Sequence, residues 1–331
     1  RVGDVTFFVA STSTTGEELW RTDGTEDGTF LIKDIGSGAS GGLATFGPQP
    51  NFAGANVNGR LFFAASDDVH GQELWTSDGT AEGSYLVKDI APGSAASLPR
   101  NFANVNGVLY FSANDGANGS ELWRSDGTEA GTVRLELRPG PGSSNPSCLT
   151  DVDGTLFGMA SDADGFHLWK SDGTEAGAVR LRRFDNLGTN ENASSLTNVN
   201  GTLFFRAYGD LGSGQHGSEL WMSAGTPEGT VLVKDLNPGP ATSNASWLTN
   251  VDGVLYFQAR VGSDTELWKS DSTASGTVRV RDVNPLGSSQ PTNLANVDGT
   301  LFITANSMTG LNLGKSDGTS EETERLHDAV L

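Results

Sequence analysis

The chain contains a single cysteine, Cys148, among its 331 residues. One cysteine excludes an internal disulfide framework and a zinc site built from several cysteines. Long apolar runs are also missing, and no stretch approaches the length that a membrane-spanning helix needs. Apolar residues do not recur with a helical period over any useful length, so we expect essentially no helix.

Positive charge is scarce as well. The 21 Lys and Arg residues stand against 41 Asp and Glu residues, which gives a formal net charge of −20. Nucleic acids and anionic membrane surfaces bind positive protein surfaces, so we expect neither nucleic acid as a partner nor insertion into a membrane. The chain begins at Arg1 without a starting methionine or signal peptide, and we read it as a processed or excerpted piece.

What the chain has in abundance is one repeated unit. The tripeptide Glu-Leu-Trp, or a variant of it, ends at residues 20, 75, 123, 169, 221, 268 and 314, which are 46–55 residues apart. A glycine-containing segment such as "SDGTEAGT" follows each copy, and "NVNG" or a close variant precedes each copy from the second onward. Internal repeats at such a period are typical of solenoids and propellers.

Each unit reads as four short antiparallel strands. Asn-Gly or Asp-Gly separates the first two β-rich runs and a second Asp-Gly turn separates the last two, which is a strong hairpin signal. Four strands in each of seven repeats predict an all-β, seven-bladed β-propeller. We expect a single propeller over residues 1–331, with blades at about 1–45, 46–96, 97–144, 145–192, 193–243, 244–290 and 291–331. Only Arg1 and Val2 precede the second strand of the first unit, so the first blade should lack a full innermost strand.

The repeated motif is interpreted as structural, because an enzyme needs one constellation of residues rather than seven. An Asp that enters a tight turn accepts backbone N–H hydrogen bonds, and Gly supplies the positive φ of the turn. The Trp provides buried area between blades. The structural set consists of Trp20, Trp75, Trp123, Trp169, Trp221 and Trp268 together with Asp23, Asp78, Asp126, Asp172, Asp271 and Asp317.

This pattern resembles the bacterial ELWxxDGT repeat family over nearly the whole chain, with departures at His167, Ala224, Ser272 and Gly314. The resemblance implies a secreted or surface-exposed bacterial protein whose repeats form propellers. It implies no catalytic residues and no defined ligand. The hairpin also resembles the structural Asp-box turn of sialidases.

Function is expected at the variable loops, which connect the second to the third strand and the fourth strand to the next blade. Trp247 is the one tryptophan outside the repeated position. It either stacks on a sugar or flat ligand or packs over the first strand of its blade. His70, His167 and His216 also fall in or beside these loops. They belong to separate blades and are expected to lie too far apart to share a metal ion. His70 and His216 are candidates for ligand binding instead.

The variable loops are acidic, and oxygen-rich loops suit Ca²⁺. "DADG" at Asp162 to Gly165 comes closest to a calcium loop, so Asp162 and Asp164 are the candidate metal ligands. The alternative is a solvated turn. Ca²⁺ is the only cofactor that the sequence suggests.

We therefore expect a non-catalytic extracellular or cell-surface module that binds a carbohydrate, a surface polymer or a protein through the variable loops. The alternative is a structural building block of a bacterial surface assembly. A propeller glycoside hydrolase or polysaccharide lyase is less favoured, since the first strands ("NFANV", "LTDV", "LTNV", "NLANV") carry few catalytic residue types.

Overall fold

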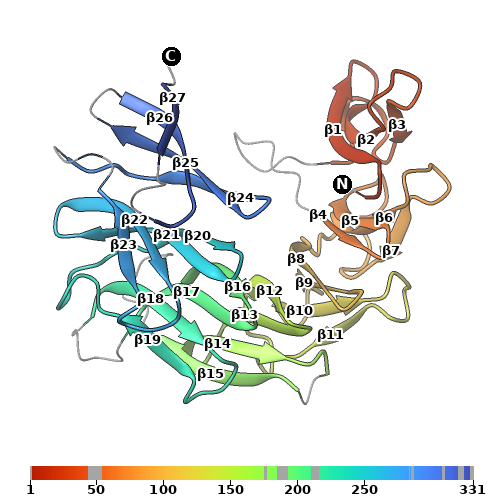
Figure 1. Ribbon diagram of the computed structural model, residues 1–331. Coiled ribbons are helices and arrows are strands. Elements are labelled where there is room, and N and C mark those ends of the chain that lie inside the picture. Colours follow the sequence, from red (N-terminus) through yellow and green to blue (C-terminus); the bar gives the residue numbers. More distant parts are fainter. Residues whose placement is uncertain are drawn as a thin grey trace. The chain divides into compact units, whose positions relative to one another are not determined.

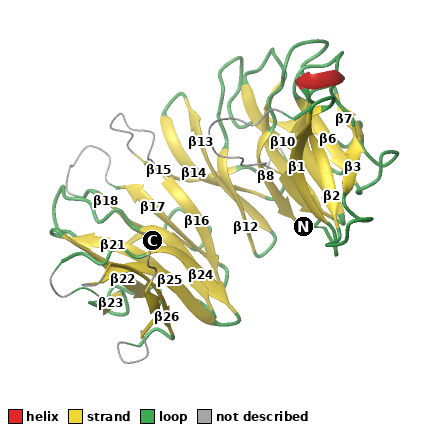
Figure 2. Ribbon diagram, turned by 90° about the horizontal axis from the view of Figure 1, so that it is seen from above, coloured by secondary structure: helices red, strands yellow, loops and turns green. Residues whose placement is uncertain are grey.

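The computed structural model describes residues 2–43, 54–174, 177–184, 193–209, 216–282, 284, 287–307, 310–319 and 324–328. These residues form 27 β-strands and one short 3-10 helix, η1 (Gly38–Ser40) (Figures 1 and 2). Within the described residues, no helix is long and apolar enough to cross a membrane. The protein is therefore all-β, as the sequence predicts.

Consecutive strands pair into seven antiparallel sheets. Sheet 1 contains β1 (Thr6–Thr12), β2 (Gly16–Thr22) and β3 (Phe30–Lys33), and sheet 2 contains β4 (Gly54–Val57), β5 (Arg60–Ala65), β6 (Glu73–Ser77) and β7 (Tyr85–Lys88). Sheet 3 contains β8 (Arg100–Val105), β9 (Val108–Asn114), β10 (Ser120–Ser125) and β11 (Val133–Leu135), and sheet 4 contains β12 (Ser147–Val152), β13 (Thr155–Asp162), β14 (Gly165–Ser171) and β15 (Val179–Phe184).

The remaining sheets repeat the same order of strands. Sheet 5 contains β16 (Ala193–Val199), β17 (Thr202–Tyr208), β18 (Ser218–Ser223) and β19 (Thr230–Lys234). Sheet 6 contains β20 (Ser246–Val251), β21 (Val254–Val261), β22 (Asp264–Ser270) and β23 (Val278–Arg281). Sheet 7 contains β24 (Thr292–Val297), β25 (Thr300–Ser307), β26 (Gly310–Ser316) and β27 (Glu324–Asp328).

Sheet 1 is the incomplete one, as expected. Among its described residues, the chain before β1 makes only a single antiparallel bridge, between Val2 and Val5. Val199 and Thr202 form the corresponding pair in sheet 5, at the end of a full first strand. The first sheet thus begins at the end of its innermost strand.

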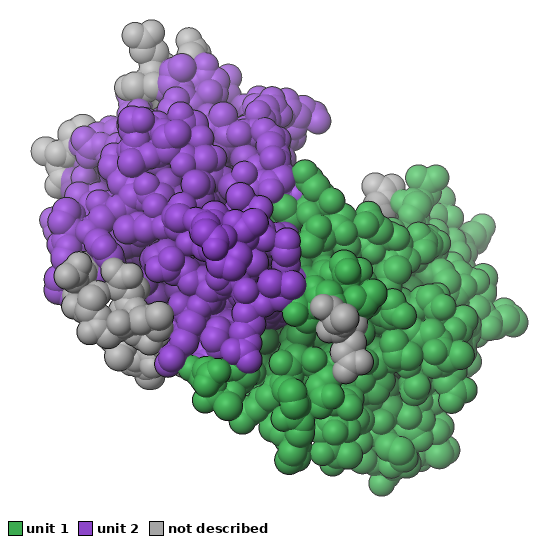
Figure 3. Space-filling view, turned by 90° about the horizontal axis from the view of Figure 1, so that it is seen from below, with its two compact units in different colours: residues 1–156, 160–164, 171–178 green, residues 157–159, 165–170, 179–331 purple. Residues whose placement is uncertain are grey.

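The chain divides into two compact units (Figure 3). Unit 1 comprises residues 1–156, 160–164 and 171–178, and unit 2 comprises residues 157–159, 165–170 and 179–331. Within unit 1 the first strands β4, β8 and β12 lie side by side, and within unit 2 β16, β20 and β24 do the same. The first strands are therefore the innermost strands of each unit.

Apolar side chains fill the space between neighbouring sheets. In one cluster Val57, Leu74 and Val87 of sheet 2 pack with Phe111 and Trp123 of sheet 3. Each such side chain contributes about 1.5–3 kcal/mol by leaving water. Because both faces of an inner sheet are covered in this way, apolar residues occupy successive positions instead of alternating with polar ones.

The hairpin between the first and second strands follows the Asn-Gly signal in sheets 2, 3 and 5 and the Asp-Gly signal in sheets 4, 6 and 7. Asn58 and Gly59 have φ values of 51° and 77°, and the equivalent pairs Asn106–Gly107 and Asn200–Gly201 are alike. Positive φ at both central residues fits a type I′ turn, whose twist matches that of the flanking strands.

The Asp of the turn between the third and fourth strands accepts hydrogen bonds within that turn. Asp126 Oδ1 accepts hydrogen bonds from the backbone N–H of Thr128 at 2.9 Å and from its hydroxyl at 2.7 Å. Asp23, Asp78, Asp172, Asp271 and Asp317 make the same pair of bonds in their sheets. These bonds lower the pKa of each of the six Asp carboxyls below its usual value.

The same turn explains the second glycine of the motif. A Cβ atom added to Gly131 would lie 2.0 Å from Asp126 Oδ1, so the carboxylate needs a glycine beneath it. In sheet 5, where Ala224 replaces the Asp, the turn keeps its bond from Gly229 N–H to the Thr226 hydroxyl at 3.0 Å.

Cationic side chains join these turns to the preceding sheet. Lys88 Nζ of β7 donates to the carbonyl of Thr132 at 2.9 Å, and Lys234 Nζ of β19 donates to the carbonyl of Thr277 at 2.8 Å. From the third strands, Arg124 donates to the carbonyl of Gly173 and Lys269 to that of Gly318. The motif therefore holds successive sheets together at the end of the strands where it lies.

Ser272 is the exception that tests the glycine requirement of the turn. It has φ 78°, whereas the glycines at the same position in other sheets have φ between 82° and 95°. A non-glycine residue in this region costs about 1 kcal/mol. We predict that Ser272→Gly raises the free energy of unfolding by about 1 kcal/mol, measured by urea denaturation.

The reverse change is the control. No atom lies within 4 Å of a Cβ added to Gly24, so Gly24→Ser changes the backbone cost alone and should lower the stability by a similar amount. A Ser272→Gly variant less stable than the parent would contradict this account of the turn.

Candidate functional site

The variable loops all leave the sheets at the end opposite to the Asn-Gly and Asp-Gly turns, because alternate connections of an antiparallel sheet emerge at opposite ends. We call this end of each sheet its variable end. It consists of the loops between second and third strands and the connections from each fourth strand to the next sheet.

In sheets 1, 2, 3, 5 and 6, a buried glutamate of the third strand anchors the connection that follows the sheet. Glu73 is 0% exposed, and its carboxylate accepts hydrogen bonds from the N–H groups of Ile90 and Ala91 at 3.0 and 3.2 Å. It also accepts from the N–H and hydroxyl of Ser97 at 3.1 and 2.6 Å. Both ends of the connection between β7 and β8 are thereby tied to β6.

Other sheets repeat this arrangement, which we call the glutamate clamp. Glu121 binds Leu137 and Ser144, Glu219 binds Leu236 and Ser243, Glu266 binds Ser289, and Glu18 binds Gly36 and Gly42. Because Gly42 stands where the others have Ser, Glu18 Oε2 has no hydrogen-bond partner among the described residues. His167 in sheet 4 and Asn312 in sheet 7 occupy the glutamate position and are buried.

Burial disfavours the charged form of these carboxyls. It raises the pKa of Glu18, Glu73 and Glu121 above the usual value, and it raises the pKa of Glu219 to about 7. The backbone and serine hydrogen bonds oppose this shift without cancelling it.

The two candidate histidines each pair with a carboxylate of their own sheet. His70 Nδ1 lies 3.0 Å from both oxygens of Asp67, and this hydrogen bond raises the pKa of His70. His216 Nδ1 lies 2.9 Å from Asp235 Oδ2. His70 belongs to unit 1, whereas His216 and Trp247 belong to unit 2.

Asp162 is the last residue of β13, and Asp164 lies in the tight turn before β14. Asp162 Oδ1 accepts a hydrogen bond from the backbone N–H of Asp164 at 2.7 Å. Within the residues that the structure describes, no group of three or more His, Cys, Asp or Glu side chains is placed to hold a metal ion.

Trp247 has an unusual backbone. It lies where the register of β20 shifts against β21, it has φ 57°, and it is 43% exposed. Asn101, Cys148 and Asn293 occupy the same position in sheets 3, 4 and 7, with φ 57°, 52° and 53°. Asn tolerates this conformation better than Trp or Cys, so Trp247 should cost stability relative to the Asn of sheets 3 and 7.

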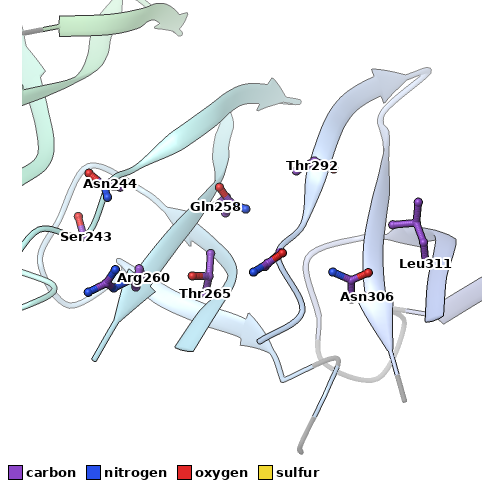
Figure 4. Close-up of a pocket in the computed structure, with 9 residues that line it drawn as sticks. Ser243, Asn244, Gln258, Arg260, Thr265, Thr292, Asn306 and Leu311 are labelled. Carbon is purple, nitrogen blue, oxygen red and sulfur yellow. The ribbon is translucent and has the colours of Figure 1, made fainter. Parts of the chain in front are cut away.

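A polar pocket opens at the variable end of sheets 6 and 7 (Figure 4). Its volume is about 410 Å³, within the range of small-ligand sites. Sheet 6 and its preceding loop supply Ser243, Asn244, Gln258, Arg260 and Thr265. Sheet 7 and its preceding loop supply Gln290, Thr292, Asn306 and Leu311.

Trp247 is not one of the lining residues, but its neighbour Ser246 contacts the lining. The hydroxyl of Ser246, which precedes Trp247, donates to Gln258 Oε1 at 2.7 Å, and Gln258 lines the pocket. The amide groups of Asn244, Gln290 and Asn306 are side-chain hydrogen-bonding groups in the same lining. The sequence suggested Trp247 but neither the pocket nor the glutamate clamps. The signal for the clamps was present, since the Glu recurs in five copies of the motif.

No family model and no curated protein matches the sequence. Solved structures match it over nearly its whole length. A puromycin-hydrolyzing peptidase of Mycobacterium tuberculosis has a TM-score of 0.53 and 13% identity, over 98% of this chain and 52% of the peptidase. A prolyl endopeptidase has a TM-score of 0.52 and 13% identity, over 98% of this chain and 48% of that one. The β-propeller domain of the trilobed protease from Pyrococcus furiosus has a TM-score of 0.44 and 10% identity, over 99% of this chain and 93% of that one.

The chain has a seven-bladed β-propeller fold. The propeller spans about half the length of the two peptidases it matches. At this identity the likeness concerns the fold alone, because one fold hosts many unrelated functions.

The glutamate clamps of the propeller predict a pH dependence. The folded pKa values of Glu18, Glu73, Glu121 and Glu219 lie above the unfolded value, and that of Glu219 is about 7. Between the two values the folded chain binds more protons than the unfolded chain, so stability falls as the pH rises through this window. The Asp residues of the Asp-Gly turns have lowered pKa values, so the stability that their carboxylates contribute is lost only in stronger acid. We predict that the melting temperature is several degrees higher at pH 5 than at pH 7.5.

Glu219→Gln separates this effect from the charge of the whole chain. The variant cannot titrate at this position, so it should be destabilised more at pH 5 than at pH 7.5. Glu129→Gln, on an exposed turn, should leave the pH profile unchanged. A wild-type stability that rises from pH 5 to pH 7.5 would contradict the raised pKa values.

Proposed function

We propose that the chain is a non-catalytic module that binds carbohydrate at the variable end of sheets 6 and 7, through Trp247 and the adjoining pocket. The observation that carries the proposal is Trp247 itself. A large aromatic side chain stays 43% exposed in a backbone conformation that the equivalent asparagines hold more easily. Strained exposed residues cluster at functional sites.

The pocket residues support a sugar as the ligand. Side-chain amides and hydroxyls offer both donors and acceptors to the hydroxyl groups of a saccharide, and an aromatic ring offers an apolar face with a polar edge. Among the residues that the structure describes, the lining contains no Asp or Glu. It therefore suits ligand recognition better than acid–base hydrolysis, which usually needs two carboxylates.

The ELWxxDGT-like repeat supports a place for the module in that family and at the bacterial cell surface. A surface module would also use the high negative charge of −20 to stay soluble. The second candidate is a structural building block of a surface assembly, in which the propeller contacts proteins instead of glycans.

The test is a glycan and polysaccharide screen on the full chain, followed by calorimetry with Trp247→Asn. The variant should fold with an unchanged or higher melting temperature, because Asn suits the backbone at this position. Its affinity should fall about fivefold or more, since an aromatic contact is worth about 1 kcal/mol.

Leu98→Asn is the matched control. Leu98 is also exposed, at 42%, and has φ 52°, but it lies in unit 1. The Leu98→Asn variant should be more stable than the parent and should bind glycan with unchanged affinity. Full affinity in Trp247→Asn would refute the proposed site, and a chain that binds no glycan would favour the building block. Binding lost in EDTA would instead implicate Ca²⁺ at Asp162 and Asp164.

A further inference from the structure

Arg260 is a residue of the pocket that the repeat does not explain. It lies near the end of β21, and the equivalent positions in the other six sheets hold Ser11, Ser66, Asn114, Ser161, Tyr208 and Asn306. The scaffold therefore does not require a cation at this position. Its side chain is nonetheless part of the pocket lining.

The guanidinium of Arg260 is oriented but unpaired. Its Nε donates to the carbonyl of Gly262 at 2.9 Å, and it forms no ion pair with a carboxylate among the described residues. Arg60, Arg134 and Arg279, by contrast, each pair with an Asp. With Nε held, the two terminal nitrogens of Arg260 remain available for a bidentate bond to a planar anion.

The rest of the lining supplies donors beside this cation. Gln258 Oε1 is already used by the Ser246 hydroxyl, so its Nε2 group is the part left for a ligand. Asn306 and Gln290 add amide groups, which can donate as well as accept, from sheet 7. A pocket with one cation and no carboxylate among its described lining residues favours a negatively charged ligand.

We infer that the pocket selects a saccharide that carries an isolated carboxylate, bound by Arg260, among neutral hydroxyl groups. This inference rests on the proposed carbohydrate-binding function and names the class of sugar. The net charge of −20 restricts the ligand further. The negative protein surface repels a polyanion along the whole length of that polymer. A single carboxylate at the pocket interacts mainly with Arg260, because salt screens the more distant charges.

The test compares two probes that differ only in charge. The first is a xylo-oligosaccharide with one glucuronic acid branch, and the second is the same compound with its carboxyl group reduced to an alcohol. Calorimetry on the full chain should give about tenfold tighter binding of the acid, the size of a charge-assisted hydrogen bond. Arg260→Gln should abolish this preference while it keeps the weaker binding of the reduced sugar.

Two controls accompany the variant. Arg100→Gln removes one exposed arginine from sheet 3 and should leave the preference intact, which excludes an effect of net charge alone. Arg260→Lys keeps the charge but not the planar fork, so it should retain only part of the preference. Polygalacturonate, a polyanion, should bind more weakly than the singly charged probe.

The outcomes separate this inference from the proposed function. Equal affinity for the acid and the reduced sugar, or a preference that survives in Arg260→Gln, would overturn the role of Arg260 and leave carbohydrate binding standing. Tighter binding of polygalacturonate than of the singly charged probe would contradict the preference for an isolated carboxylate. Binding of neither oligosaccharide would overturn the inference together with the pocket as a glycan site.

Discussion

Hydrogen bonds to buried carboxylates hold the connections between successive sheets. The connections are built from Gly, Pro, Ser and other small residues, which have little apolar surface of their own to bury. Glu73 supplies the missing anchor by accepting bonds from both ends of its connection. Without it, several backbone N–H groups would be buried without partners, at a cost of about 1–3 kcal/mol each.

The clamp also fixes the backbone of the residue next to it. The residue after the clamped serine has positive φ in each case, as for Asn244 at 49° and Gln290 at 44°. Both side chains are exposed at the variable end and line the pocket. A structural element that recurs in several sheets thus presents one variable side chain per connection, at a positive φ that favours Asn but is also held by Leu98 and Gln290.

Much of the fold was predictable because its signals are local. Asn-Gly and Asp-Gly pairs mark the hairpins, and the Asp of the motif bonds to the Thr two residues on. The glutamate clamp was missed because its partners lie 16–24 residues away, as for Glu73 with Ile90 and Ser97. A Glu before Leu-Trp otherwise reads as an ordinary polar position on a strand.

The candidate site was only partly predictable, for the same physical reason. Trp247 stands out by composition, but its positive φ depends on a register shift between β20 and β21 that no short sequence signal encodes. The pocket joins residues from several segments of sheets 6 and 7, and Arg260 looks like ordinary variation at a strand end.

Comparing equivalent positions across the repeats separates structural from functional residues. Where the backbone imposes a requirement, most copies agree, as the glycines of the Asp-Gly turn do. Trp247 breaks such a requirement by standing where asparagine suits the backbone better, and Arg260 introduces a cation where no copy needs one. Both occur in sheet 6, where Arg260 lines the pocket and Ser246, the neighbour of Trp247, bonds to Gln258 of the lining. The proposed ligand site therefore rests on residues that the repeat does not dictate.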